Sequence, residues 1–267
     1  MRNSTTAIRI IAALAILLGA SGALHAQEPE STDQPSPLRI LHLTGGGWHD
    51  YETQQHILSQ GVEARINAEV DIVFTDEPGF EGMDWIEGYD AVLHNHCWAG
   101  MEPEAQAIMA ERVKEAHAET GVGAVLLHCA MATFRDAPTW FEFTGVDMYD
   151  HEPHYPFTVM NFRPDHPLMK PFGAEWDTPQ GELYNIIRVL PNTNPLAIAY
   201  GRERSKQYEI VIWTNEYEGV PIFATTIGHH NETMEQATYL DLVARGVLYV
   251  TGKLGDDGQP VEGYDAE

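Results

Sequence analysis

The sequence predicts an α/β protein with a doubly wound, mostly parallel sheet to which antiparallel strands are added. Short apolar runs alternate with amphipathic segments through the first half of the chain, which is the pattern of repeated strand–helix–strand units. After Pro138 the pattern changes, because prolines and aromatic residues become dense and the apolar runs become shorter and more alternating. About 230 residues follow Leu38, which is enough for one large domain with its own core.

The first 26 residues are predicted to be a signal peptide that does not belong to the fold. Arg2 and Arg9 flank a polar start, an apolar run follows, and Leu24-His25-Ala26 resembles a small-residue cleavage site. The apolar run covers about 12 residues, whereas about 20 are needed to span a bilayer. We therefore expect an exported protein, periplasmic or secreted, with no stable membrane insertion after cleavage. Residues 27–37 are rich in Pro, Ser and acidic side chains and are predicted to form a flexible leader.

The domain proper is predicted over residues 38–252, and its first half contains four buried strands. Each is a short apolar run, and the first ends in three glycines. One helix with a single apolar face is expected over 51–67, and another begins at Pro103. The strands are expected at Leu38–Thr44, Val70–Thr75, Ala91–Asn95 and Gly123–His128. Short links between these elements favour a parallel sheet with right-handed crossovers.

The second half is predicted to complete the sheet and to add antiparallel strands over one end. Its shorter strands are expected at Tyr155–Asn161, Glu182–Val189, Leu196–Tyr200, Ile210–Trp213 and Ile222–Thr226. A last helix is expected from Glu232 to Val250, with one apolar face. Residues 253–267 are predicted to form a polar tail that frays.

The charge of the chain excludes several classes of partner. It carries 15 Lys and Arg against 40 Asp and Glu, and loss of Arg2 and Arg9 with the signal peptide makes it more acidic still. Such a chain repels nucleic acid and anionic membrane surfaces. The run Gly45-Gly46-Gly47 lacks the Lys-Ser/Thr of a phosphate loop and the spacing of a dinucleotide loop, so no nucleotide site is predicted.

Histidines gather where the predicted strands end, and this is the strongest functional signal. Open α/β sheets bind ligands outside the carboxyl ends of their strands. His49 follows the first strand, His96 the third and His229 the last, while His128 ends the fourth. Each of these is as readily explained as a hydrogen-bonded structural residue. The prediction of a site therefore depends on the histidines converging in the fold.

The site residues are assigned by their chemistry. Histidine transfers protons near neutral pH and ligates metals when neutral. Glu182, before a predicted strand, can orient a histidine, bind sugar hydroxyls or act as a base, although a solvated turn acid is an equal reading. The predicted catalytic residues are His128, His229, Glu182 and His49. The predicted substrate-binding residues are Trp48, His96, Trp98, Tyr184 and His230, of which the aromatic ones are equally explained as core residues.

No cofactor is fixed by the sequence, but a divalent metal is a candidate. His128 and His229 are the ligands expected if one is bound, since histidines at separate strand ends can meet around one ion. No local spacing supports this: His151 and His154 flank Pro153, so they do not form the helical histidine pair of zinc proteases.

Cys97 and Cys129 are the only cysteines, and three interpretations of them stay open. They are too few for a disulfide framework or a cysteine-type zinc site. Cys129 is a candidate nucleophile, although a small buried hydrophobe is the commoner fate of such a residue. Alternatively the two pair, because they follow strands that are expected to be neighbours and export leads to an oxidising compartment.

Several motifs together resemble the ThuA-like, or trehalose utilisation, family. They are Gly46-Gly47-Trp48-His49-Asp50, the segment 121–130 ending in Leu127-His128-Cys129-Ala130, His166-Pro167, Gly181-Glu182-Leu183-Tyr184 and Gly228-His229-His230. The resemblance covers roughly residues 38–250. It implies a class I glutamine amidotransferase-like fold, which is flavodoxin-like in its doubly wound sheet. It also implies a role in sugar catabolism, often beside oxidoreductases that make 3-keto sugars.

The same resemblance bears on Cys129. True amidotransferases of this fold carry a nucleophilic cysteine on a tight turn after a central strand, and Cys129 stands close to that place. The glycines of that turn are missing here, and no His-x-Glu pair follows. ThuA-like proteins generally lack the amidotransferase triad, which lowers the case for a nucleophile.

The leading functional hypothesis is an exported enzyme that acts on a sugar or a 3-keto-sugar glycoside by histidine and glutamate acid–base chemistry, with or without a metal. A 3-keto group acidifies the neighbouring C–H bond, so a base there can drive isomerisation, elimination or glycosidic cleavage. The alternative is a non-catalytic periplasmic carbohydrate-binding or accessory protein with the same aromatic and polar lining. A hydrolase that uses Cys129 is the third hypothesis.

Overall fold

The computed structural model of the chain describes residues 34–76 and 79–266. The signal peptide predicted over 1–26 and most of the predicted leader lie outside the described residues. Within the described residues, no helix combines the length and the apolar character that a membrane crossing requires. The predicted class, an α/β fold with a mixed sheet, is confirmed.

Five parallel strands form the centre of the sheet, in the order β2-β1-β3-β4-β11. Their bounds are β1 (Leu38–Gly46), β2 (Ala68–Phe74), β3 (Ala91–Cys97), β4 (Gly123–Leu127) and β11 (Val220–Thr225). Every residue of β3 and β4 is buried, because helices cover both faces of the parallel region. Because β1, β3, β4 and β11 are parallel neighbours in this order, their carboxyl ends lie along one edge of the sheet, as the doubly wound prediction requires.

Antiparallel strands extend this centre beyond β11, in the order β10-β9-β6-β7. Their bounds are β10 (Tyr208–Tyr217), β9 (Asn194–Tyr200), β6 (Thr158–Asn161) and β7 (Glu175–Asp177). A separate two-stranded sheet pairs β5 (Val146–His151) with β8 (Tyr184–Val189). The strand expected from Tyr155 begins later, at Thr158, and Pro156 has no N–H to donate to a ladder.

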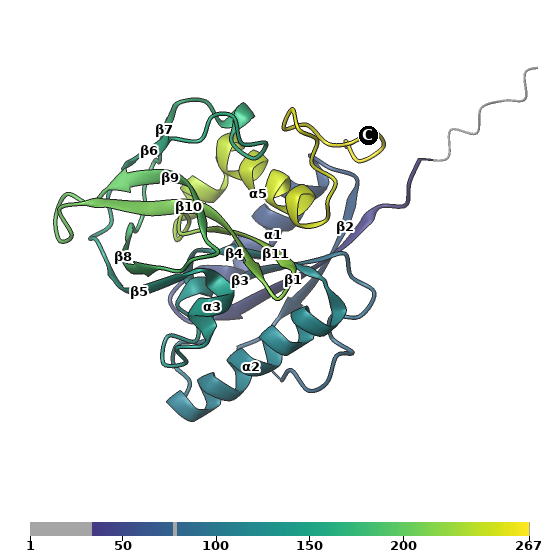
Figure 1. Cartoon of the computed structure of the whole chain (residues 1–267), viewed down its shortest axis with the longest axis horizontal. Helices are drawn as coiled ribbons and strands as arrows, with labels where there is room; N and C mark the ends of the chain where they lie inside the picture. Colours follow the sequence, from purple (N-terminus) through teal and green to yellow (C-terminus); the bar gives the residue numbers. More distant parts are fainter. Residues whose placement is uncertain (1–33, 77–78, 267) are drawn as a thin grey trace, which may run out of the picture. The chain divides into compact units, whose positions relative to one another are not determined.

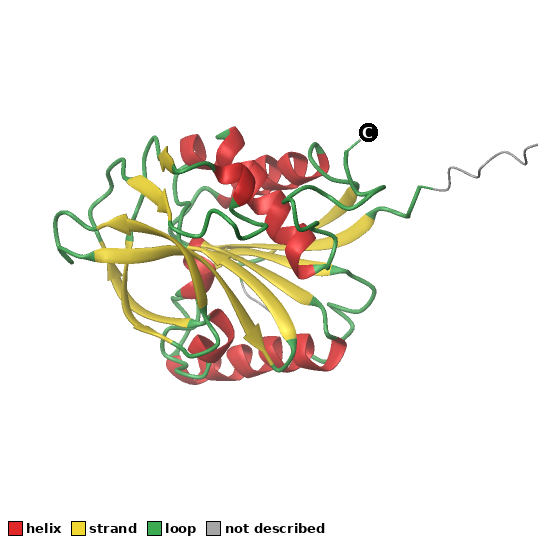
Figure 2. Cartoon of the chain, turned by 45° about the horizontal axis from the view of Figure 1, so that its top comes forward, coloured by secondary structure: helices red, strands yellow, loops and turns green. Residues whose placement is uncertain are grey.

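Helices form one layer on each face of the sheet (Figures 1 and 2). One layer holds α1 (Tyr51–Glu63), α4 (Asn231–Met234) and α5 (Ala237–Val250), and the other holds α2 (Pro103–Thr120) and α3 (Trp140–Thr144). Each layer has its own core, with Leu58 and Val243 in the first and Val113 and Phe143 in the second. Two 3₁₀ turns, η1 (His128–Met131) and η2 (Lys170–Phe172), complete the described elements.

Two predicted elements differ from the structure at the carboxyl end of the chain. The helix expected from Glu232 to Val250 is divided, because Gln236 takes an extended backbone (φ −65°, ψ 135°) between α4 and α5. The tail does not fray over its described part: the N–H of Asn67 donates to the carbonyl of Tyr264 (3.0 Å), and the N–H of Val261 donates to that of Lys253 (2.9 Å). The first of these hydrogen bonds ties the tail to the segment between α1 and β2, and the second joins two parts of the tail, which the polar sequence does not reveal.

Candidate functional site

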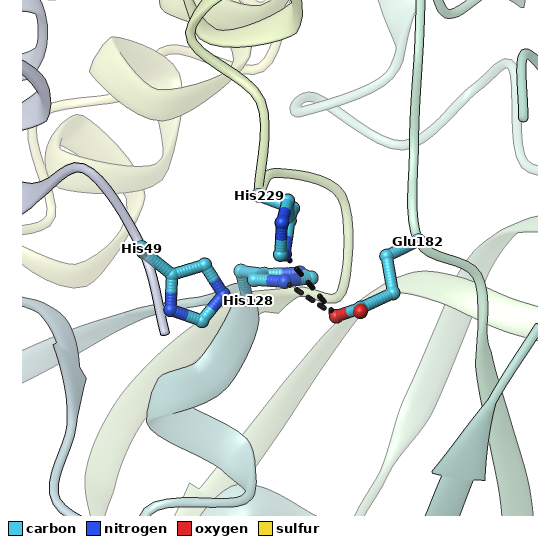
Figure 3. A group of neighbouring side chains, drawn as sticks. All are labelled: His49, His128, Glu182 and His229. Carbon is cyan, nitrogen blue, oxygen red and sulfur yellow. Dashed lines mark ion pairs between the residues drawn. The ribbon is translucent and has the colours of Figure 1, made fainter. Parts of the chain in front are cut away.

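Four of the predicted catalytic side chains meet at the carboxyl edge of the parallel strands. His49 follows β1, His128 follows β4, and His229 follows β11, while Glu182 precedes β8. One ligating atom from each lies within 4.8 Å of the others. Figure 3 shows the three imidazole rings together, with the carboxylate of Glu182 reaching them from a separate segment. The predicted convergence of these residues is confirmed in geometry, while their catalytic roles stay predictions.

The backbone is strained at the residues that reach this site. Trp48, His128 and His229 have φ values of 81°, 48° and 71°, in the left-handed region that L residues avoid. A residue held there costs about 1–3 kcal/mol, and such residues cluster at functional sites. Gly228, with φ 152°, is needed beside them, because a Cβ there would lie 2.8 Å from the Cβ of His128.

Glu182 is the centre of the site, and it is surrounded by imidazoles. It is 6% exposed. Its Oε1 lies 2.9 Å from His154 Nε2 and 3.2 Å from His151 Nδ1, while its Oε2 lies 3.1 Å from His128 Nε2 and 3.4 Å from His229 Nδ1. Burial opposes ionisation, but the histidines outweigh it and hold the pKa of Glu182 well below its usual range. The group is therefore an ionised carboxylate that orients four rings.

Hydrogen bonds on the far side of two rings define how they face the carboxylate. His128 Nδ1 donates to the carbonyl of Thr226 over 2.7 Å, so in the neutral ring Nε2 carries a lone pair. His49 Nδ1 lies 2.9 Å from the hydroxyl of Tyr51. Burial first, and then the neighbouring His128 and His229, lower the pKa of His49 to about 2. His49 is therefore a neutral imidazole.

A cavity of about 470 Å³ opens in front of these residues. Its volume lies within the ~300–1,000 Å³ that is typical of small-molecule sites. Tyr184 forms part of its wall, and Trp48 and Tyr149 stand at its edge with 76% and 79% of their surface exposed. Large aromatic faces this exposed are the kind of surface on which a sugar ring stacks. The predicted substrate-binding positions Trp48 and Tyr184 thus lie in the cavity lining.

His151 and His154 belong to the site, although they were absent from the predicted site residues. His151 ends β5, and His154 lies in the loop that follows. Pro153 excludes a helical zinc-protease motif for this pair. A loop can instead bring both rings to one carboxylate. The close spacing of His151 and His154 in the sequence was the signal that could have identified them as site residues. His230, a predicted substrate-binding residue, stands at the outer side of the cluster. Its Nε2 lies 3.1 Å from Nδ1 of His154.

His151 is the member of the cluster whose free nitrogen is best defined. Its Nδ1 donates to the carbonyl of Glu152 over 2.8 Å and lies 3.2 Å from Glu182 Oε1. Its Nε2 then carries a lone pair, and no described residue hydrogen-bonds it. The ring lines the cavity with 39% of its side chain exposed. This is the arrangement of a general base that a carboxylate orients.

Two predicted substrate-binding residues, His96 and Trp98, are not among the residues that line the cavity. Both are buried, and their rings stack with centroids 3.8 Å apart. Successive side chains of a strand point to opposite faces, and His96 points with His94 toward the α2 layer. The indole N–H of Trp98 donates to the carbonyl of Thr75 (2.9 Å).

His96 instead belongs to a buried chain of neutral imidazoles that links β3 to α2. His117 Nδ1 donates to the carbonyl of Val122 (2.6 Å), and its Nε2 lies 3.1 Å from His94 Nε2. His94 Nδ1 lies 3.0 Å from His96 Nε2, and His96 Nδ1 lies 3.2 Å from the hydroxyl of Thr133. Burial lowers the pKa of His96 to about 3 and that of His117 to about 4. One set of tautomers satisfies every nitrogen in the chain.

Cys97 and Cys129 form a disulfide with a Cα–Cα distance of 5.3 Å. Pairing is thus the interpretation that the structure bears out, and it excludes Cys129 as a thiol nucleophile in this state because no cysteine is free. The residue on the tight turn after β4 is His128, with its positive φ, rather than Cys129. Both cysteines line the cavity.

Glu152 holds the loop that carries His151 and His154. It accepts hydrogen bonds from the backbone N–H groups of Glu203, Arg204 and Ser205 and from the hydroxyl of Tyr155. Burial opposes ionisation, but these donors outweigh it and lower the pKa of Glu152 to about 2. The carboxylate therefore fixes the position of the histidine loop by charge-assisted hydrogen bonds.

Glu152→Gln is expected to lower the free energy of unfolding by about 1.5–3 kcal/mol near neutral pH, because hydrogen bonds to a charged group contribute about that much. A depressed folded-state pKa gives stability above the unfolded value near 4.5, and that stability is lost as the pH falls through about 2. Urea unfolding of both proteins near neutral pH and at pH about 3 measures this. A difference that stays constant between the two pH values would contradict it.

The fold and the turn that carries His128 define a protein of the class I glutamine amidotransferase-like fold. A glutamine amidotransferase from Thermotoga maritima shares this architecture, with a TM-score of 0.50 and 13% identity over 82% of this chain and 98% of that chain. The chain belongs to the ThuA family, described as trehalose utilisation, whose model matches residues 39–250.

Two solved ThuA-like structures resemble the chain over nearly their whole length. The protein from Parabacteroides merdae has a TM-score of 0.68 and 21% identity, over 86% of this chain and 97% of that chain. The protein from Bacteroides uniformis has a TM-score of 0.60 and 16% identity, over 87% and 98%. No curated protein matches the chain. The family supports a sugar-related role, and at these identities the solved structures establish the fold alone.

Proposed function

We propose that the chain is an enzyme that acts on a sugar or a 3-keto-sugar glycoside by proton transfer in the cavity beside Glu182. The observation that carries this proposal is a buried, ionised carboxylate with four imidazole nitrogens within 3.4 Å, next to a cavity with an exposed aromatic edge. A module that only binds sugar has no need for a carboxylate that orients several titratable rings. The family's description, trehalose utilisation, supports the substrate class.

His151 is the group proposed to accept the proton. In a 3-keto glycoside the carbonyl acidifies the C2–H bond, and Nε2 of His151 removes that proton. The electron pair of the broken C–H bond forms a C1–C2 double bond while the bond from C1 to the glycosidic oxygen breaks. The leaving oxygen takes a proton from a protonated histidine of the cluster. Addition of water across the double bond then gives the free keto sugar, and no oxidant or reductant is consumed.

Glu182 is proposed to act on this reaction through the rings that it holds. Its Oε1 contacts His151 Nδ1 at 3.2 Å and His154 Nε2 at 2.9 Å. An ionised partner at Nδ1 stabilises the imidazolium that forms when Nε2 takes a proton. Trp48 and Tyr149, at the edge of the cavity, are proposed to stack on the sugar ring.

The test compares turnover and binding over a panel of glycosides and their 3-keto forms. We expect turnover of a 3-keto glycoside, and we expect His151→Gln to lower kcat by about 10²–10⁴-fold with binding retained. The exposed His56, on α1, gives the control variant His56→Gln, which should behave as wild type. Binding of sugars without any turnover would support the accessory-protein alternative. Neither binding nor turnover across the panel would sink the proposal.

Export is part of the proposal. The sequence carries a three-part signal pattern, and the Cys97–Cys129 disulfide suits an oxidising compartment. Mass spectrometry of the protein from a cell fractionation should find Gln27 as the first residue of an extracytoplasmic form. Full-length protein confined to the cytoplasm would contradict it.

A further inference from the structure

The two oxygens of Glu182 have different surroundings, and the difference calls for a cation on one side. Oε1 faces N–H groups, because His154 Nε2 donates to it and His151 Nδ1, which donates to the carbonyl of Glu152, lies 3.2 Å away. Oε2 faces His128 Nε2 at 3.1 Å. Since His128 Nδ1 donates to the carbonyl of Thr226, Nε2 of the neutral ring has a lone pair that points at the lone pairs of Oε2. Two acceptors this close repel unless a positive charge lies between them.

Two further nitrogens around Oε2 are buried and lack hydrogen-bond partners. His49 Nε2 and His229 Nδ1 are both inaccessible to solvent, and no described residue hydrogen-bonds either one. A buried polar atom without a partner costs about 1–3 kcal/mol, so such atoms need a reason. The hydroxyl of Tyr184 stands 3.4 Å from His128 Nε2, which is longer than a normal hydrogen bond from a hydroxyl. Three imidazole nitrogens therefore surround one carboxylate oxygen, and among the described residues only the hydroxyl of Tyr184, at 3.4 Å from His128 Nε2, offers any of them a hydroxyl donor.

The spacing of these four atoms suits one ion. Zinc-type bonds of about 2.0–2.1 Å in a tetrahedral arrangement put neighbouring ligand atoms about 3.4 Å apart. Oε2 lies 3.1 Å from His128 Nε2 and 3.4 Å from His229 Nδ1, and all four ligand atoms lie within 4.8 Å of one another. The rings are oriented from behind by the carbonyl of Thr226 and the hydroxyl of Tyr51, as histidine ligands of metals usually are.

We propose that His49 Nε2, His128 Nε2, His229 Nδ1 and Glu182 Oε2 hold one divalent first-row transition-metal ion (Figure 3). Three imidazoles and one carboxylate suit zinc, iron, nickel or cobalt. Magnesium and calcium prefer oxygen ligands and are not expected to bind here. His49 and His229 line the cavity, so the ion would lie at the cavity wall, where expansion to five-coordination would admit a substrate oxygen.

The metal site adds a cofactor to the proposed function. Binding of the ion does not depend on that function, and only the catalytic role of the ion rests on it. An ion held at this place would act as a Lewis acid on a sugar carbonyl and would stabilise the negative charge that develops on the carbonyl oxygen as the C2 proton leaves. His151 and His154 contact the other carboxylate oxygen and stay available for proton transfer.

The experiment measures metal binding by itself, without any turnover. The mature chain is stripped with chelator and dialysed against Zn²⁺, Co²⁺ or Mg²⁺, and bound metal is counted per chain by elemental analysis. We expect one Zn²⁺ or Co²⁺ per chain and no stoichiometric Mg²⁺. Bound Co²⁺ should show the visible absorption of a low-coordinate nitrogen and oxygen site.

The variants are chosen so that the fold tolerates them. His128→Asn and His229→Asn remove a ligand and keep a residue that accepts positive φ, and Glu182→Gln keeps the shape of the side chain. Each should weaken Co²⁺ binding at least tenfold, and the matched control His56→Asn, on the exposed side of α1, should not. Circular dichroism verifies that each variant is folded.

Two results would overturn the metal site: no stoichiometric Zn²⁺ or Co²⁺ in the wild type, or unchanged Co²⁺ binding in all three ligand variants. The first would indicate that His128 pairs with Glu182 as an imidazolium. Other results would overturn the proposed function without overturning the metal site. If the protein binds Co²⁺ through these residues but turns over no sugar, the proposed function is wrong and the metal site stands. If the metal-free protein shows full turnover, the proposed function stands and the ion has no catalytic role.

Discussion

Glu182→Gln should lower turnover of the glycoside that the wild type processes by about 10²–10⁴-fold, the size of effect that positioned acid–base groups give. The substitution removes the negative charge that four imidazoles share. It also puts an amide where the N–H groups of His151 and His154 need acceptors. Because the lost interaction strengthens when a ring takes up a proton, kcat should fall more than KM rises. Steady-state kinetics and a thermal melt measure the two effects separately.

Glu232→Gln is the matched control for this experiment. Glu232 is an exposed carboxylate on the same segment as His229 and His230, and it makes no contact with Glu182. Its variant should keep wild-type kcat and KM. Equal activity of the Glu182→Gln enzyme and the wild type would remove Glu182 from the mechanism.

His94→Ala should lower the free energy of unfolding by about 3–5 kcal/mol, because it opens a cavity and breaks the buried imidazole chain in the middle. His94 is fully buried and contacts His96 through Nδ1 and His117 through Nε2. Its loss leaves two buried nitrogens without partners. Urea unfolding monitored by tryptophan fluorescence gives the change in free energy.

The exposed His56 again supplies the control, since His56→Ala should shift the urea midpoint very little. The refolded His94→Ala protein should still bind Co²⁺, because the imidazole chain and the proposed metal ligands share no residue. A loss of less than 1 kcal/mol would mean that the chain of tautomers contributes little to stability.

The sheet could be predicted because its central strands are buried on both faces and therefore appear as continuous apolar runs. β3 and β4 were found in this way, whereas the strands from β8 to β11 were predicted from shorter and more alternating apolar runs. The short elements were missed for the opposite reason. β5 mixes acidic and apolar residues, and β7 has only three residues, so neither presents a pattern that differs from a loop.

The site could be predicted only in part. The order of strands and helices predicts which residues lie at the carboxyl edge of the sheet, but not toward which face of the sheet each side chain points. His128 and His229 were found at their strand ends and do converge. His96 stands at the same edge, but the alternation of side chains along β3 turns it with His94 into the α2 layer. Assigning a face to each residue requires the strand register, which the sequence leaves open. His151 ends β5, a strand that was not predicted, and His154 lies in the loop that follows it.

The left-handed backbone at Trp48, His128 and His229 creates a trade-off between the stability of the protein and its activity. Glycine at any of the three would relieve backbone strain of about 1–3 kcal/mol, and asparagine would relieve part of it. A selection for heat resistance alone would therefore enrich glycine or asparagine there and remove side chains that form the site. Any effort to stabilise this protein for practical use should hold these three positions fixed and look for gains elsewhere, as in the exposed loops.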